Sequence, residues 1–274
     1  MRLSILALAG AAVLAGSSAW AADQHDRDAC AEAGRAPAGA VAGCTRLIEG
    51  GAREKPATLA WAYARRGMAQ GVSGQYEAAI ADLSEAIRLD PGHAPSHYNR
   101  ATAYYALGRY DLAVADYTEA LRLKPDDPAA LNNRGAALRR QGRTDLALAD
   151  FNAAIRLEPG YAEALSNRCY ALAAGPDLTA ARADCEAALR LKPGFRHALA
   201  HLGLVELRRG DTGAALAAYD AALAGGQNDP EARYGRGVAR IRAGDPDSGR
   251  ADIAAASAAD ATLGATFAGY GLAP

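Results

Sequence analysis

The stretch Leu121-Arg122-Leu123-Lys124-Pro125 recurs along the chain in closely similar form. Four such segments end in prolines that stand 34 residues apart, at Pro91, Pro125, Pro159 and Pro193. A fixed period of this size indicates an array in which one small structural unit stacks on the next. Counting from the prolines predicts six repeats, at 60–93, 94–127, 128–161, 162–195, 196–229 and 230–261.

Each repeat predicts two amphipathic helices joined by a short turn. The first helix carries small or apolar residues at helical spacing, such as Leu131, Gly135 and Leu138. A glycine then marks the turn in five repeats, at Gly74, Gly108, Gly142, Gly210 and Gly244. The second helix ends near the repeated proline, which cannot continue it. One such pair cannot bury its own apolar stripe, so stacking on its neighbours must stabilise it.

This pattern resembles the tetratricopeptide repeat (TPR) family over about 60–261. The second repeat carries the family motif in the series Ala101, Tyr104, Gly108, Tyr110, Ala113, Tyr117, Ala120 and Pro125. The resemblance implies an all-α fold, a right-handed α-α superhelix of about six helix–turn–helix repeats. It also implies a capping helix in residues 262–274. The later repeats depart from the motif, because Gly225-Gly226-Gln227 replaces the terminal proline of repeat five, and Pro246 and Gly249 stand at motif positions of repeat six.

Composition excludes several classes of protein. Half of the 274 residues are hydrophobic and 22% are charged, which is too apolar for a disordered chain. Lys and Arg number 30 against 31 Asp and Glu. This balance gives no electrostatic reason to expect nucleic acid as a partner, nor a polybasic patch for a membrane surface.

The first 21 residues have the layout of a secretory signal peptide. Met1-Arg2 supplies a positive start, the uncharged apolar run 3–16 follows, and Ala19-Trp20-Ala21 is a small-x-small cleavage site. A membrane anchor is the alternative, but the apolar run is shorter than the roughly 20 residues of a spanning helix. The sequence therefore predicts an exported protein, periplasmic or secreted, with no membrane span in the mature chain. Cys30 and Cys44-Thr45 resemble the opening of exported alphaproteobacterial TPR proteins.

Four cysteines allow three disulfide pairings, and export permits them. Cys169 falls on the first helix of its repeat where other repeats have Ala101 or Gly135. Cys185 falls on the second helix where they have Tyr117 or Phe151. In the TPR fold these positions face each other, so we expect Cys169–Cys185. By the same scheme we expect Cys30–Cys44, in a shortened helical half-repeat within 22–59. The alternative is a metal or redox site, but no Cys-x-x-Cys and no His at ligand spacing support it.

Arginine and aspartate recur at two fixed positions. The arginines are followed by an aspartate 16 residues later in five repeats, in the pairs Arg66 and Asp82, Arg100 and Asp116, Arg134 and Asp150, Arg168 and Asp184, and Arg236 and Asp252. Repeat five lacks both, with Leu202 and Ala218. Joint presence and joint absence predict that the two positions meet as a structural ion pair. If partly exposed, each pair would stabilise the fold by roughly 0–1 kcal/mol.

The resemblance also implies a binding surface, because the first helices of TPR repeats line a groove. The candidate groove residues are Asn99, Asn133, Asn167, Asn132, Tyr98, Tyr105, Tyr170, Arg139, Arg140 and Arg208. The asparagines at the period of 34 resemble the ladder of O-GlcNAc transferase, whose amides grip a peptide backbone. An amide both donates and accepts, so it can pair with any peptide unit. The alternative is that each asparagine only bonds the neighbouring helix.

No pattern of catalytic residues appears, and we expect neither an enzyme nor a cofactor. His197 and His201 share a helix face at i, i+4, but no third metal ligand is evident. The sequence therefore predicts a non-enzymatic scaffold that binds a protein or peptide partner. The alternatives are a self-assembling structural protein and an accessory subunit of a separately encoded cell-envelope enzyme. We expect a monomer, with an oligomer left open.

Overall fold

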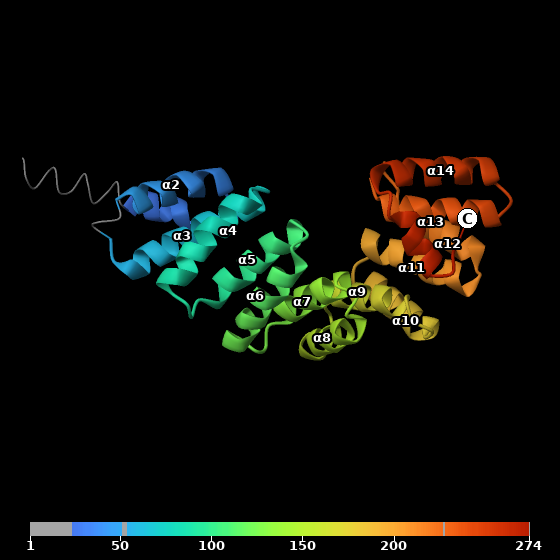
Figure 1. Cartoon of the computed structure of the whole chain (residues 1–274), viewed down its shortest axis with the longest axis horizontal. Coiled ribbons are helices and arrows are strands. Elements are labelled where there is room, and N and C mark those ends of the chain that lie inside the picture. The colour runs from blue at the N-terminus through green and yellow to red at the C-terminus, as the bar shows by residue number, and fades with distance from the viewer. Residues whose placement is uncertain (1–23, 51–53, 227, 274) are drawn as a thin grey trace, which may run out of the picture. The chain divides into compact units, whose positions relative to one another are not determined.

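The computed structural model describes residues 24–50, 54–226 and 228–273, and every regular element in these ranges is helical (Figure 1). The predicted signal peptide, 1–21, lies outside the described residues. Residues 24–31 form the first described helix. The following helices are α2 (Pro37–Glu49), α3 (Pro56–Val72), α4 (Tyr76–Leu89), α5 (Ala94–Ala106), α6 (Tyr110–Leu123), α7 (Pro128–Arg140), α8 (Thr144–Leu157), α9 (Ala162–Leu172), α10 (Leu178–Leu191), α11 (Arg196–Arg209), α12 (Thr212–Ala222), α13 (Pro230–Arg242), α14 (Pro246–Ala259) and α15 (Leu263–Gly269).

The chain forms two compact units, and the boundary between them in the sequence lies between Pro125 and Asp126. Unit 1 contains α2 to α6 and unit 2 contains α7 to α15. Within each unit the helices pack in consecutive pairs, with α3 on α4, α5 on α6, and so on to α13 on α14. Helix α3 begins at Pro56, four residues before the repeat boundary at 60, because a proline is well suited to the first turn of a helix.

The turn within a repeat is set by its glycine. Gly142 has a φ of +76° and stands between α7 and α8, and Gly108 has a φ of +71° between α5 and α6. Residues with a side chain rarely adopt this left-handed conformation, whereas glycine adopts it at little cost. The second helix can therefore fold back on the first within a few residues.

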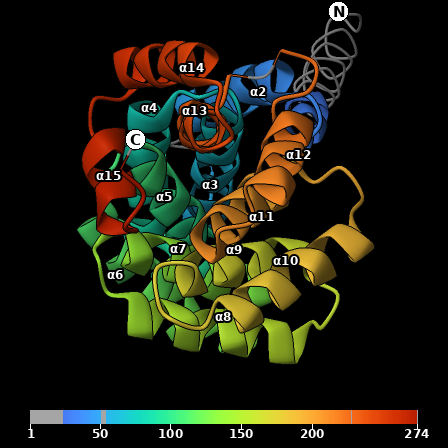
Figure 2. The same ribbon diagram turned by 90° about the vertical axis from the view of Figure 1, so that its right-hand side faces the viewer.

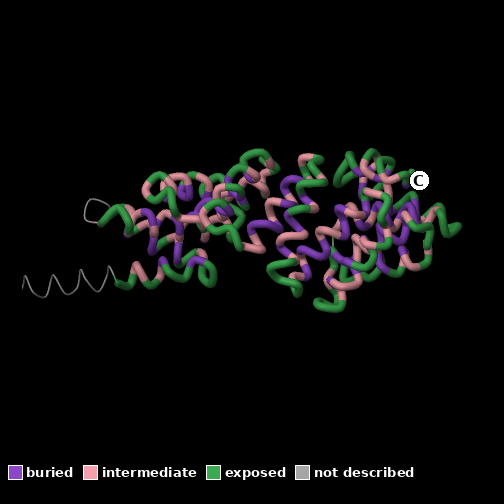
Figure 3. Tube along the Cα trace, turned by 90° about the horizontal axis from the view of Figure 1, so that it is seen from below, coloured by how far each residue is buried: buried purple, intermediate pink, exposed green. Residues whose placement is uncertain are grey.

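The core alternates along each helix between buried and exposed positions (Figure 3). Within a helix pair a small residue faces a large one. Tyr219 on α12 is 1% exposed and lies against two glycines, Gly203 on α11 and Gly235 on α13. A Cβ built at Gly203 would stand 2.8 Å from the ring, which is closer than atoms approach in proteins. The glycines therefore let three helix backbones close around one aromatic side chain.

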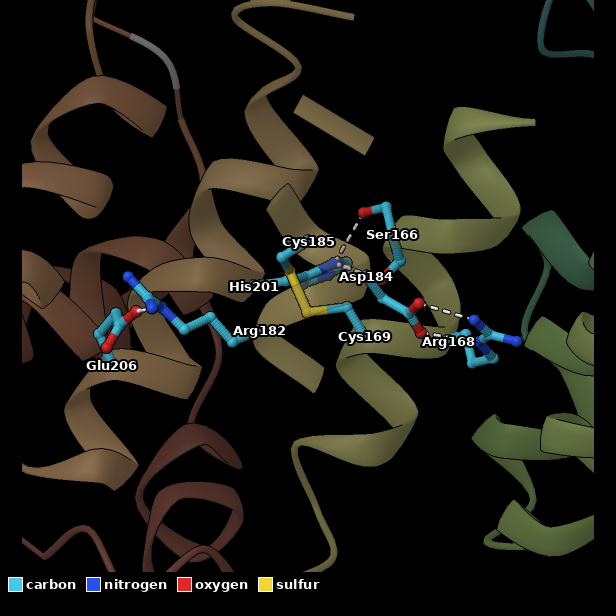
Figure 4. The surroundings of a disulfide bond; sticks show 8 residues. All are labelled: Ser166, Arg168, Cys169, Arg182, Asp184, Cys185, His201 and Glu206. Atoms are coloured by element: carbon cyan, nitrogen blue, oxygen red, sulfur yellow. Dashed lines mark hydrogen bonds and ion pairs between the residues drawn. A yellow bond between two sulfur atoms is a disulfide. The ribbon is translucent and has the colours of Figure 1, made fainter. Parts of the chain in front are cut away.

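Two disulfides bridge helix pairs, and all four cysteines are fully buried. Cys30 is bonded to Cys44 in unit 1, and Cys169 on α9 is bonded to Cys185 on α10 in unit 2. Figure 4 shows the second bridge crossing between its two helices. The bridge occupies the place that a small residue and an aromatic ring fill in repeats three and five. It therefore substitutes a covalent link for a packing contact.

The predicted arginine–aspartate pairs are confirmed. In each of the five repeats Nε and Nη2 of the arginine donate to the two carboxylate oxygens of the aspartate, at 2.6 to 2.8 Å. The aspartates are only 6–8% exposed. The arginine also reaches the preceding repeat, since Nη1 of Arg168 donates to Asn152 at 2.7 Å. In repeat five, which lacks the pair, buried Glu206 of α11 instead accepts from Arg182 of α10 (Figure 4).

Removing one arginine is expected to cost more than the 0–1 kcal/mol of an exposed pair, because its aspartate stays buried. Arg134→Ala should lower the free energy of unfolding by about 2–3 kcal/mol, below the roughly 3–5 kcal/mol of a fully buried pair because the arginine is partly exposed. Urea denaturation measures this value. Arg122→Ala, which breaks the exposed pair with Glu119, is the matched control and should cost less than about 0.5 kcal/mol. Equal losses in the two variants would contradict the account.

Candidate functional site

The asparagines of unit 2 bond to one another across two first helices. Asn167 on α9 donates to Oδ1 of Asn132 on α7 at 2.8 Å, and Asn132 donates to Oδ1 of Asn133 at 3.1 Å. Asn132 is only 4% exposed. These contacts match the alternative reading, in which an asparagine of the series bonds the neighbouring helix. Asn132 and Asn167 therefore position one another.

In unit 1 the asparagine at the same repeat position makes fewer hydrogen bonds than those of unit 2. Asn99 on α5 is half-buried, and its side chain makes no hydrogen bond to any residue in the described ranges of the chain. Tyr98 packs edge-on against Tyr117 at 5.6 Å between ring centroids, and Tyr105 packs against Tyr110 at 5.4 Å. Both first-helix tyrosines remain half-buried. An amide with open hydrogen-bonding capacity thus shares helix α5 with two partly accessible rings.

The inner face of unit 2, defined here as Arg139, Tyr170, His201 and Glu231, brings together the first helices of four successive repeats. The guanidinium carbon of Arg139 lies 4.3 Å from the centre of the Tyr170 ring. The His201 ring stacks on the Tyr170 ring, with 4.5 Å between their centroids. The Tyr170 hydroxyl donates to Oε1 of Glu231. Tyr170 is only 7% exposed, so it is the buried centre of the cluster.

Burial sets the protonation of this cluster. Burial lowers the pKa of His201 to about 3, and the electrostatic effects of Arg139 and His197 act in the same direction. Desolvation raises the pKa of Glu231, although the hydrogen bond from Tyr170 and the charge of Arg139 act in the opposite direction. Desolvation likewise raises the pKa of Tyr170 above its ordinary range. At neutral pH the imidazole and the phenol are therefore both neutral, and the two rings interact by stacking.

The remaining predicted residues do not all join this face. Nη1 of Arg208 donates to the backbone oxygen of Gly175 at 2.7 Å and to that of Ala173, so Arg208 holds the turn between α9 and α10. Arg140 is exposed at the end of α7. Sequence reasoning missed Glu231, although it stands at the second position of repeat six, which corresponds to His197 in repeat five. The predicted residues also leave out Tyr270, whose hydroxyl donates to the Tyr170 hydroxyl, because Tyr270 lies after the last repeat.

A cleft of about 500 Å³ opens in unit 1 beside Trp61. Its wall is mostly apolar and comes from the first turns of α3, the last turn of α4 and the loop before α5, with the lining residues Pro56, Ala57, Ala60, Trp61, Ala86, Leu89, Asp90 and His93.

Among the described residues no cluster of three His, Cys, Asp or Glu side chains could hold a metal ion. No helix in the same ranges is long and apolar enough to span a membrane.

Comparison with known proteins decides the family. The model of the tetratricopeptide repeat matches the chain at 64–128, 98–162, 132–194 and 201–263. The chain belongs to the tetratricopeptide repeat family. The all-α class and the TPR solenoid expected from the period of 34 are thereby confirmed. No curated protein matches the chain in sequence.

Solved TPR proteins share the fold at low sequence identity. YrrB, "a TPR protein with an unusual peptide-binding site", is 23% identical with a TM-score of 0.52, and the match covers 66% of this chain and 90% of YrrB. PilW, a type IV pilus biogenesis factor, is 22% identical with a TM-score of 0.64, covering 73% and 93%. Pseudomonas aeruginosa pilF is 21% identical with a TM-score of 0.61, covering 76% and 95%. At these identities the likeness shows the TPR fold alone.

Proposed function

We propose that this TPR protein is a non-enzymatic scaffold that binds an extended peptide segment of a partner protein along its first helices. The observation that carries the proposal is the recurrence of asparagine at one repeat position of α5, α7 and α9, with Asn99 still free to bond a ligand. A primary amide can donate to a peptide carbonyl and accept from a peptide N–H at once. Such a contact grips the backbone whatever the side chains of the peptide.

Partly accessible aromatic side chains on α5 of unit 1, and an exposed cationic side chain on α7 of unit 2, support the same assignment. Tyrosine and arginine are the residues most often found as anchors of interfaces. Tyr98 and Tyr105 flank Asn99 on α5, and Arg140 is exposed on α7. YrrB, which has the same fold, is described as having a peptide-binding site. Surfaces that offer amides, rings and guanidinium groups suit a polypeptide better than a small apolar ligand.

We further propose that the protein works outside the cytoplasm. Two disulfides with completely buried sulfurs support this location, because structural disulfides persist mainly in oxidising compartments. The charged start, apolar run and small-x-small site of residues 1–21 give independent support from the sequence. Metabolic labelling and fractionation of expressing cells test the proposal, since cleavage after Ala21 should leave a mature chain that starts at Ala22.

A peptide-capture experiment tests the binding proposal. The immobilised protein is incubated with a degenerate library of nine-residue peptides, and the retained peptide is quantified for the wild type and for Asn99→Ala combined with Asn133→Ala. Each lost amide contact should weaken binding roughly fivefold, on the basis of about 1 kcal/mol per hydrogen bond. Gln75→Ala, which removes an exposed amide from the turn before α4, is the matched control and should bind as the wild type does. Full retention by a natively folded double variant would refute the amide ladder.

A further inference from the structure

The C-terminal segment of unit 2 returns to the first helices of earlier repeats. Helix α15 packs on α13 and α14 (Figure 2). Its apolar residues are firmly inserted, since Phe267 is 1% exposed and Leu272, just beyond the helix, is 2% exposed. The Phe267 ring lies 4.7 Å from that of Tyr234 on α13. The segment is therefore packed into the core of unit 2. Its last tyrosine, Tyr270, lies between two buried residues, Phe267 and Leu272.

That tyrosine, Tyr270, reaches the inner face. Its hydroxyl donates to the Tyr170 hydroxyl at 3.1 Å across a sequence separation of 100 residues. The Tyr170 hydroxyl in turn donates to Glu231, 61 residues away. A chain of hydrogen bonds thus joins α9, α13 and the end of α15. This chain of hydrogen bonds includes Tyr170, which the sequence predicts to be a groove residue.

The consequence is that the inner face of unit 2 is already occupied by the chain itself. Tyr170 is 7% exposed, and both of its neighbours in the hydrogen-bond chain belong to the last part of the protein. The candidate residues of unit 1 differ, because Tyr98, Asn99 and Tyr105 are half-buried and lie in a unit without α15. A ligand of unit 2 would have to compete with Tyr270 for Tyr170.

We propose that Tyr270 is an intramolecular plug of the inner face of unit 2, and that a tyrosine of a bound peptide displaces it. The residue now in place indicates the partner, since the phenol of a peptide tyrosine can make the same two contacts as Tyr270. These are the hydrogen bond to the Tyr170 hydroxyl and the ring edge against Phe267, 6.0 Å between centroids. This inference rests on the proposed peptide-binding function and adds a regulatory step to it.

Displacing the plug is feasible because Tyr270 is only partly buried. Tyr270 can turn away while Phe267 and Leu272 keep α15 in place, since these two residues hold the segment in the core. A site that is competent only when Tyr270 is out binds with an apparent affinity reduced by the competent fraction. Removing the ring should therefore raise affinity, by about tenfold if the plug is out one tenth of the time.

The test uses the full-length protein and nine-residue peptides with a fixed central tyrosine and degenerate flanks. Retained peptide is compared for the wild type, Asn99→Ala, Tyr270→Ala, and Tyr270→Ala combined with Arg139→Ala. The control Thr266→Ala changes the same helix at a residue whose hydroxyl bonds only the Thr262 backbone. Circular dichroism and melting curves show that each variant is folded. We expect about tenfold greater retention by Tyr270→Ala, loss of that gain on adding Arg139→Ala, and no change for Thr266→Ala.

Three results would overturn the plug, and they have different meanings. Equal retention by the wild type and Tyr270→Ala, with weaker retention by Asn99→Ala, would leave the proposed function standing and refute the plug. No retention by any of these proteins would refute the peptide-binding function and the plug together. A gain that survives Arg139→Ala would also refute it, because the new binding would then lie away from the inner face.

Discussion

Replacing Cys169 and Cys185 together with alanine is expected to lower the free energy of unfolding by about 3–5 kcal/mol. The closed loop spans 16 residues, so its loss restores conformational freedom to the unfolded chain. The two alanines also leave unfilled space between α9 and α10, where both sulfurs are fully buried. Urea denaturation of the double variant under non-reducing conditions measures the loss.

A second variant separates the covalent link from the packing. Cys169→Gly combined with Cys185→Phe rebuilds the pair that repeat three has in Gly135 and Phe151. It lacks the disulfide but fills the space, so it should recover at least about 1 kcal/mol relative to the alanine pair. If the two double variants prove equally unstable, the bridge does not occupy the place of a small–large packing contact.

Gly235→Ala is expected to destabilise unit 2 by at least about 2 kcal/mol, although alanine is ordinarily the better helix former. A Cβ at this position would stand 2.3 Å from Oη of Tyr219. The ring cannot retreat, because Gly203 contacts its other end and the side chain is 1% exposed. Thermal melting monitored by circular dichroism measures the change.

Gly39→Ala provides the matched control for this substitution. Gly39 lies in α2, it is exposed, and a Cβ there would meet no atom within 4 Å. Helix propensity alone then operates, and the variant should be stabilised by roughly 0.5–1 kcal/mol. Parallel gains at both glycines would show that Tyr219 is not clamped between helices. Combining Gly235→Ala with Tyr219→Leu should restore part of the lost stability, since it removes the clashing end of the ring.

The period of 34 was sufficient to predict the helix pairs, the turn glycines and the arginine–aspartate contacts. These features are local: each joins positions within one repeat, so alignment of the repeats places them together. The strength of the ion pairs was underestimated, because only the structure shows that aspartates such as Asp150 are 6–8% exposed. The start of α3 at Pro56 also differed from the period, since the first repeat has no preceding repeat to set its boundary.

The inner face of unit 2 could be predicted only in part. Tyr170 and Arg139 were marked by their repeat positions, and the structure brings them into contact. The contacts of Tyr170 with Glu231 and Tyr270 span 61 and 100 residues, and they depend on how successive helix pairs rotate within the unit. A small rotation per repeat accumulates along an array, and the sequence gives no direct measure of it. For the same reason, the sequence did not predict that Tyr270 would contact Tyr170 on this face.

Hydrogen–deuterium exchange of the full-length protein, with and without the best retained peptide, tests the central claim most directly. If a peptide lies along the first helices, it should slow exchange in α5, α7 and α9, while exchange in the second helices α6, α8 and α10 stays unchanged. Exchange at the end of α15, around Tyr270, should become faster when a tyrosine-bearing peptide binds. Protection confined to the second helices, or absent from every first helix at saturating peptide, would contradict binding along the first helices.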